Sequence, residues 1–334
     1  MIARLVRWLF ALVALAILVA GGAAWWFLQR PLPLPASPYD FKVPSGATLS
    51  SVARDFTSAG ILPHPAPLIA LARWRGVDRA IKAGSYEIDS GITLPQLLAR
   101  LTQGDVTQTS LTIIEGATFA DVRATLRARS DVVKAVTDLP DGELLAKLGI
   151  DAPSPEGQFF PDTYFFASGS SDAAVLKRAH RLLKARLDAG WEKRANGLPL
   201  STPYEALILA SIVEKETGRA ADRGNVASVF INRLKAGMRL QTDPTVIYGI
   251  RDRFDGNLRK SDLETDTPYN TYTRDGLPPT PIALPSQASL DAVLNPPSTS
   301  FLYFVSRGDG SSEFTSSLAE HNRAVARFQL KRSR

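Results

Sequence analysis

The sequence contains no cysteine and only three histidines among its 334 residues. The lack of cysteine excludes disulfides, cysteine nucleophiles and thiolate metal sites. The histidines His64, His180 and His321 are scattered without the spacing of metal ligands, so we expect no metal and no cofactor. A serine triad would have to be assembled from unrelated segments.

Strong charge of one sign is also missing. The net charge is +6, but lysine and arginine are spread along the chain and are not massed in a patch interleaved with aromatic residues. Nucleic acid is therefore not an expected partner. Attraction to anionic lipid or to the peptide carboxylates of a cell wall would account for the charge equally well, and an ordinary solvated surface is favoured over either. A hydrophobic content of 45% allows two or three small folded domains.

The first long feature that is present is an apolar run. Residues 9–28 carry no charge and match the ~20 residues that cross a bilayer core, with Trp25 and Trp26 at the far end. We expect a transmembrane helix at 9–28, preceded by a cytoplasmic N-terminus at 1–8. The alternative is a signal peptide cleaved near Gly22–Ala24, although the run is longer than such a region usually is.

A short proline-rich stretch at 29–38 predicts a stiff extended spacer. The following segment, Phe41–Ala53, suggests a strand, a turn and an amphipathic helix. This pattern resembles the opening of a LysM carbohydrate-binding fold, and we expect a small LysM-like α/β module at 39–108. The alternative is a small α/β spacer without a ligand, since no aromatic platform is evident.

A helix is predicted from about Pro203 to Thr217. Thr202 and Glu205 have the spacing of a capping box, Pro203 suits the first turn, and Gly218 lies where a left-handed C-cap is expected.

Glu216 closes an apolar stripe of that helix. It follows Leu209, Ile212 and Val213 at the i, i+3, i+4, i+7 spacing of one face, so its carboxyl group should be partly desolvated at the negative end of the helix dipole. Both effects favour the protonated form that a general acid needs. Glu214 lies about 200° round the helix. The alternative is that both glutamates are solvated charges at a helix end.

Longer stretches around this helix resemble a known family. They are Glu156–Tyr164, Ala210–Thr217, Val226–Leu234, Met238–Gly249 and Tyr269–Tyr272. The chain resembles the endolytic murein transglycosylases of the YceG-like family. The resemblance implies a single-pass membrane enzyme that cuts nascent peptidoglycan, with a mixed α+β catalytic domain at 109–334 whose catalytic glutamate is near the end of a helix. In that family the catalytic glutamate precedes a threonine, which selects Glu216.

The substrate-binding residues that we expect are Gln241, Thr242, Asn270, Tyr272 and Glu214. An amide and a hydroxyl on a loop, as at Gln241 and Thr242, suit hydrogen bonds to sugars. Residues 270 and 272 share one side if the segment is extended, and the resemblance implies that both belong to the substrate cleft. Asp243 precedes Pro244 and is as well explained as a helix N-cap.

The reaction implied by the resemblance is cleavage of the β-1,4 bond between N-acetylmuramic acid and N-acetylglucosamine, leaving a 1,6-anhydro end and terminating strand elongation. The alternatives are a hydrolytic muramidase, for which Asp243, Glu264 or Asp266 would supply the second carboxylate, and a membrane-tethered peptidoglycan-binding protein without activity. The expected location is the cell inner membrane, with the catalytic domain on the periplasmic side. Expected partners are glycan strands, the cytoplasmic membrane and peptidoglycan synthases.

Overall fold

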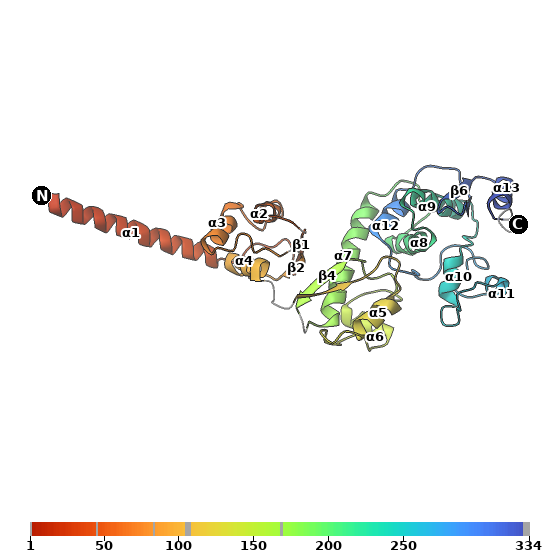
Figure 1. Ribbon diagram of the computed structural model, residues 1–334, viewed down its shortest axis with the longest axis horizontal. Helices are drawn as coiled ribbons and strands as arrows, with labels where there is room; N and C mark the ends of the chain where they lie inside the picture. Colours follow the sequence, from red (N-terminus) through yellow and green to blue (C-terminus); the bar gives the residue numbers. More distant parts are fainter. Residues whose placement is uncertain (1, 45, 83, 104–107, 168–169, 330–334) are drawn as a thin grey trace. The chain divides into compact units, whose positions relative to one another are not determined.

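The computed structural model describes residues 2–44, 46–82, 84–103, 108–167 and 170–329. The chain divides into two compact units, Met1–Ser110 with Tyr164–Ser168, and Leu111–Thr163 with Gly169–Arg334 (Figure 1). Helices and two-stranded sheets alternate along the described chain, in agreement with the predicted α+β class. Residues 104–107, at the end of the predicted LysM-like module, lie outside the described residues, and the likeness to LysM stays a prediction.

The elements of the first unit surround one small core. They are α1 (Ile2–Gln29), β1 (Tyr39–Val43), α2 (Leu49–Ser58), α3 (Ala66–Trp74), β2 (Gly84–Ile88) and α4 (Leu94–Gln103). β1 and β2 pair antiparallel with Phe41 opposite Tyr86. The Phe41 ring stacks on the Tyr86 ring with 5.3 Å between ring centroids, and it packs edge-to-face with Phe56 of α2 at 4.7 Å. These contacts pack the sheet against α2.

The segment predicted to cross a membrane lies within α1. The described part of the chain contains no helix that is both long and apolar enough for a membrane crossing, so the transmembrane part of the predicted fold is not found. The segment expected to be a spacer, 29–38, contacts the first unit, because Leu32 and Leu34 pack against its core.

The second unit is larger, and its described residues are mostly helical with one short β-hairpin. Its elements include α5 (Phe119–Arg127), α6 (Asp141–Leu148), α7 (Asp172–Glu192), α8 (Pro203–Glu216), α9 (Ala220–Lys235), α10 (Asp243–Gly249), α11 (Lys260–Glu264), α12 (Gln287–Leu294), β5 (Tyr303–Ser306), β6 (Ser312–Thr315) and α13 (Leu318–Phe328). β3 (Gln108–Thr112) pairs with β4 (Thr163–Ala167) in a separate two-stranded sheet, and most residues of both strands belong to the first unit.

Helix α8 is the centre of the second unit. Eight consecutive residues, Ala206–Val213, are buried, and α7, α9 and α12 pack around them (Figure 1). A helix that is apolar on every side is typical of a protein interior. The predicted apolar stripe is therefore one face of a helix buried on all faces, and its last turn is the part that reaches the surface.

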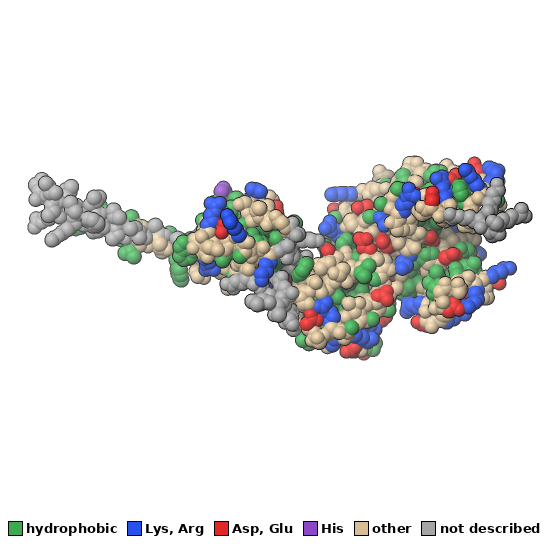
Figure 2. All heavy atoms as spheres, in the orientation of Figure 1, with side chains coloured by type: hydrophobic (Ala, Val, Ile, Leu, Met, Phe, Trp, Pro, Cys, Tyr) green, Lys and Arg blue, Asp and Glu red, His purple; other side chains and the backbone are tan. Residues whose placement is uncertain are grey.

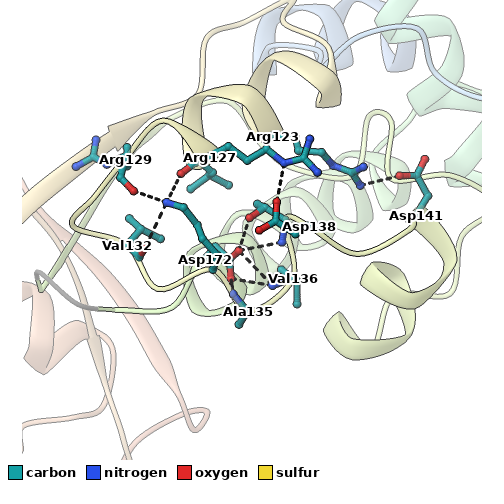
Figure 3. A network of polar contacts seen from close by, with 12 residues as sticks. Arg123, Arg127, Arg129, Val132, Ala135, Val136, Asp138, Asp141 and Asp172 are labelled. Carbon is teal, nitrogen blue, oxygen red and sulfur yellow. Dashed lines mark hydrogen bonds and ion pairs between the residues drawn. The ribbon is translucent and has the colours of Figure 1, made fainter.

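A buried carboxylate organises the loop between α5 and α6 (Figure 3). Asp172, at the start of α7, accepts hydrogen bonds from the backbone N–H groups of Ala135 at 2.8 Å and Thr137 at 2.9 Å, and from the Thr137 hydroxyl at 2.7 Å. Burial alone would raise the pKa of Asp172, but these donors outweigh it and the pKa is lowered. Asp172 therefore has a structural role, because it holds the loop between α5 and α6 against the start of α7.

The β5–β6 hairpin and α13 form the C-terminal part of the described chain. The strands pair antiparallel with Tyr303 opposite Thr315, and α13 packs on both strands. The sequence predicts a buried strand at 301–305, but only Val305 of that stretch is fully buried. All four residues of β5, Val305 included, line the cleft described below.

Basic and acidic side chains are interspersed on the face shown in Figure 2. Exposed ion pairs of the second unit include Arg274 with Asp266 at 2.9 Å and Arg239 with Asp275 at 2.9 Å. Exposed pairs of this kind contribute little to stability, and we assign them no further role.

Candidate active site

Glu216 is the last residue of α8. Thr202 caps the start of the helix by accepting from the Glu205 N–H at 3.2 Å, and Pro203 occupies the first turn, as predicted. The predicted left-handed C-cap at Gly218 is wrong, because the chain leaves the helix through an extended Thr217 with φ −145° and ψ 126°. This exit leaves the Glu216 carboxyl at the negative end of the helix dipole.

The environment of Glu216 favours its protonated form. Burial is the largest effect and raises the pKa of the Glu216 carboxyl. A hydrogen bond from the Thr242 hydroxyl to Oε1 opposes this rise, nearby Asp243 adds to it, and Arg233 opposes it. The net shift is upward, so the carboxyl group can hold a proton at a pH where an ordinary glutamate has lost it.

Glu216 borders a cleft of about 460 Å³. The polar part of its lining includes Glu216, Arg233, Gln241, Asp243 and Tyr272. Aromatic and apolar side chains, among them Phe230, Tyr303, Phe304, Leu318 and Val325, form much of the rest. Binding sites for small molecules commonly have this size and this mixture of a few polar groups with apolar surface.

Gln241 and Tyr272 both line this cleft, as their predicted binding roles require. Gln241 has φ 50°, a left-handed backbone that residues other than glycine rarely adopt and that is found preferentially at functional sites. Its backbone N–H donates to the Thr271 carbonyl at 3.1 Å, which holds it beside the turn that carries Tyr272.

Thr242 and Asn270 do not present open polar groups. Thr242 is buried and its hydroxyl donates to Glu216, so it acts on the carboxyl group and not on a ligand. Asn270 is fully buried and donates to the carbonyls of Leu263 at 3.0 Å and Thr265 at 2.7 Å, while its Oδ1 accepts from the Tyr272 N–H at 2.8 Å. Residues 271–273 form a turn and not an extended segment, which is why 270 and 272 do not share one side.

Glu214 is directed to a different partner. Its Oε2 accepts from the Ser286 N–H at 3.0 Å and from the hydroxyls of Ser286 and Ser289, the latter at 2.6 Å. Ser286 is the N-cap of α12, so Glu214 stabilises the start of that helix. Glu214 does not line the cleft, so its predicted contact with the substrate stays a prediction beside this structural role.

Comparison with known proteins identifies the family of this chain. The model of the YceG-like family matches residues 41–327, which include Glu216 and all of the cleft lining except Gln329. The chain belongs to the YceG-like family. Its match to the endolytic murein transglycosylase of Bacillus subtilis has 30% identity over 311 residues and covers 86% of this chain and 84% of the relative.

Two further comparisons agree. The endolytic murein transglycosylase of Streptococcus pneumoniae is 26% identical, in a match that covers 94% of this chain and 64% of that longer protein. A crystal structure of a putative YceG-like protein from Listeria monocytogenes has a TM-score of 0.51 and 25% identity, and the match covers 86% of this chain and 98% of the other.

Arg233 is a cleft residue of this YceG-like protein that the sequence interpretation missed. Its Nε donates to the Leu302 carbonyl at 2.7 Å and its Nη1 to the Leu240 carbonyl at 2.9 Å, which joins α9 to β5 and to the segment before α10. A signal was present, because Arg233 follows Val226 and Phe230 at helical spacing, as Glu216 follows its own apolar stripe.

Of the three carboxylates considered as a second group, one shares the cleft with Glu216. Asp243 lines it, and its Oδ1 accepts from the Tyr272 hydroxyl at 2.6 Å. Glu264 pairs with Lys260 on α11 at 3.6 Å, and Asp266 pairs with Arg274. The structure also places the N-cap of α10 at Thr242, so Asp243 is not the cap.

A further buried carboxyl lies outside the cleft. Glu156 accepts from the Phe119 N–H at 2.9 Å, at the start of α5, and from the Tyr248 hydroxyl at 3.0 Å, on α10. Burial is the largest effect and raises the pKa of Glu156 to about 7. The group joins two elements of the second unit and does not reach the cleft lining.

Proposed function

We propose that this protein is a lytic transglycosylase of peptidoglycan and that Glu216 is its catalytic acid. The observation that carries the proposal is a carboxyl group with a raised pKa in the lining of a cleft large enough for sugar residues. The relatives named endolytic murein transglycosylases support peptidoglycan as the substrate and cleavage within the strand as the mode of action.

The proposed reaction cleaves the β-1,4 bond between N-acetylmuramic acid and N-acetylglucosamine. The proton of Glu216 passes to the glycosidic oxygen, which keeps the electron pair of the breaking bond to the anomeric carbon. The C6 hydroxyl oxygen of the muramic acid then forms a bond to that carbon, and its proton passes to the Glu216 carboxylate. No water is consumed, and the new end is a 1,6-anhydro-N-acetylmuramic acid.

One carboxyl group can perform both proton transfers because its surroundings stabilise both its protonated and its ionised form. Burial favours the protonated acid that begins the reaction, and the Thr242 hydroxyl donates to the carboxylate that exists between the two steps. Gln241 and Tyr272 are the proposed contacts to the sugar, since both line the cleft.

A hydrolytic muramidase is the second candidate, and Asp243 is the observation in its favour. Hydrolysis by a carboxyl pair needs a second carboxylate near the acid, and Asp243 lines the same cleft. The two reactions differ in whether water enters the product, so the chemical form of the new end distinguishes them.

The cellular setting is proposed from the resemblance. We infer that the protein acts at the cytoplasmic membrane with its catalytic unit on the periplasmic side, where it ends the growth of nascent strands beside peptidoglycan synthases. The distribution of the protein after cell fractionation tests this location.

The two glutamates of α8 provide a matched test of the catalytic assignment. Glu216→Gln keeps the shape of the side chain and removes its proton, so cleavage of purified glycan strands should fall to background. Glu214→Gln alters the α12 contact and should retain most activity. If the Glu216 variant cut at the parental rate, or if only the Glu214 variant were inactive, the assignment of Glu216 would be rejected.

A further inference from the structure

Asp243 stands at the start of a helix but does not cap it, and its side chain lines the cleft. It is the first residue of α10, yet the cap is Thr242 and no side-chain hydrogen bond caps this helix. Asp243 is exposed in the cleft that Glu216 borders. Its Oδ1 is held by the Tyr272 hydroxyl at 2.6 Å, and within the described chain no lysine or arginine forms an ion pair with it.

We propose that Asp243 is the electrostatic partner of Glu216, and that its carboxylate stabilises the positive charge that develops on the sugar ring as the glycosidic bond breaks. The inference rests on the proposed glycan cleavage and goes beyond it by giving this reaction a second charged group. Asp243 donates no atom and carries no proton in the reaction, so the reaction scheme proposed above is unchanged.

The chemistry of glycosidic cleavage supplies the reason. The transition state resembles an oxocarbenium ion, whose positive charge lies on the anomeric carbon and the ring oxygen. A fixed negative group beside that charge stabilises the transition state more than the neutral substrate, and such a difference accelerates the reaction. Asp243 places a second carboxyl group in the cleft lining, and Glu216 must be neutral when the reaction begins.

The environments of the two carboxyl groups divide their roles. Glu216 is partly buried and its pKa is raised, whereas Asp243 is exposed and accepts a hydrogen bond from the Tyr272 hydroxyl. A protonated carboxyl group beside a carboxylate is a recurring arrangement for an acid and a charge stabiliser. Asp243 also keeps Glu216 protonated, because a negative neighbour raises the pKa of the Glu216 carboxyl.

Tyr272 positions this carboxylate. Its own N–H is held by the buried Asn270 amide at 2.8 Å, and its hydroxyl reaches across to Asp243. The turn and the start of α10 are further joined by the Thr242 N–H, which donates to the Thr271 hydroxyl at 3.1 Å. Asp243 is thus fixed through two contacts between the same two segments, as preorganised stabilisation of charge requires.

The test compares Asp243→Asn, Asp243→Glu and Tyr272→Phe in the full-length protein, with Asp188→Asn as the control. Asp188 is an exposed carboxylate of α7 that pairs with Lys184 and lies outside the cleft lining. Asp243→Asn should lower kcat by about 100-fold with a small change in KM. Asp243→Glu should recover part of the lost kcat, and the decrease in kcat should be smaller in Tyr272→Phe than in Asp243→Asn. The control should have the kcat of the parental enzyme.

The pH profile provides a readout that a purely structural role would not move. The charged groups that act on Glu216 are Asp243 and Arg233, and Tyr272, Tyr303 and His321 are the other titratable groups of the cleft lining. Removing the negative charge of Asp243 lowers the pKa of Glu216, so the basic limb of kcat/KM should move to lower pH in Asp243→Asn.

The outcomes separate this inference from the proposed function. If the parental enzyme releases anhydro ends and a folded Asp243→Asn variant keeps kcat within threefold and an unmoved basic limb, the electrostatic role is overturned. A variant that loses activity only through unfolding would show a lowered melting temperature. Tyr272→Phe, which keeps Asp243 and removes the hydroxyl that positions it, then decides: parental kcat with an unmoved basic limb would also overturn the electrostatic role. Reducing ends from the parental enzyme would reject the transglycosylase function instead.

Discussion

The stability of the second unit should depend on pH through Glu156, and Glu156→Gln should remove that dependence. The Glu156 carboxyl is buried between α5 and α10, where it accepts from the Phe119 N–H and the Tyr248 hydroxyl. Burial is the largest effect on its pKa and raises it from 4.5 to about 7. The folded protein therefore binds a proton more tightly at this site than the unfolded chain does.

The sign and size of the effect follow from that difference. Below pH 4.5 the group is protonated in both states, and its full contribution to stability is present. As the pH rises toward 7, the unfolded chain loses the proton first, so the free energy of unfolding falls. At about 1.4 kcal/mol per pKa unit, the rise from 4.5 to about 7 corresponds to a loss of about 3 kcal/mol.

Urea unfolding of the parental protein and of Glu156→Gln, measured at intervals between pH 4.5 and 8, tests this prediction. Glutamine resembles the protonated carboxyl group and does not titrate, so the variant should gain about 3 kcal/mol relative to the parent across this interval. Glu192→Gln, at an exposed position of α7, is the control and should follow the parent. Parallel curves for the parent and Glu156→Gln would refute the reasoning.

Three further predictions concern the neighbours of the site and the location of the protein. Thr242→Val removes a hydrogen bond that lowers the pKa of Glu216, so the basic limb of kcat/KM should shift to higher pH, with activity about tenfold lower; an unmoved limb would contradict this contact. Glu214→Ala leaves Ser286 and Ser289 without their acceptor and should lower the free energy of unfolding by about 2 kcal/mol while cleavage continues at low temperature; lost cleavage in a stable variant would restore a direct role for Glu214. Fractionation should find the protein in the cytoplasmic membrane with its N-terminus retained, whereas a soluble form beginning near Ala24 would indicate a cleaved signal peptide.

The placement of Glu216 could be predicted because it depends on local sequence. A cap at Thr202 and a proline at 203 fix where α8 begins, and helical spacing then aligns residue 216 with the apolar side chains of the helix. The end of the helix was less predictable. Gly218 permits a left-handed C-cap, but the direction of the chain after Glu216 is set by packing around α8 and does not require one.

The roles of Thr242, Asn270 and Glu214 could not be predicted because they depend on tertiary hydrogen bonds. The partner of Glu214 is 72 residues away, at Ser286, and no local pattern indicates that contact. An amide such as Asn270 can bind a sugar or several backbone carbonyls, and only its burial decides between them. Asp243 shows the converse, since an apparent N-cap becomes a charged group of the cleft.

The central claim is that Glu216 cleaves glycan strands without the entry of water. Purified parental enzyme should be incubated with glycan strands in water labelled with heavy oxygen, and the new ends analysed by mass spectrometry. We predict ends that are one water lighter than reducing ends and carry no label, and no such products from Glu216→Gln. Reducing ends that carry the label would contradict the account and establish a muramidase.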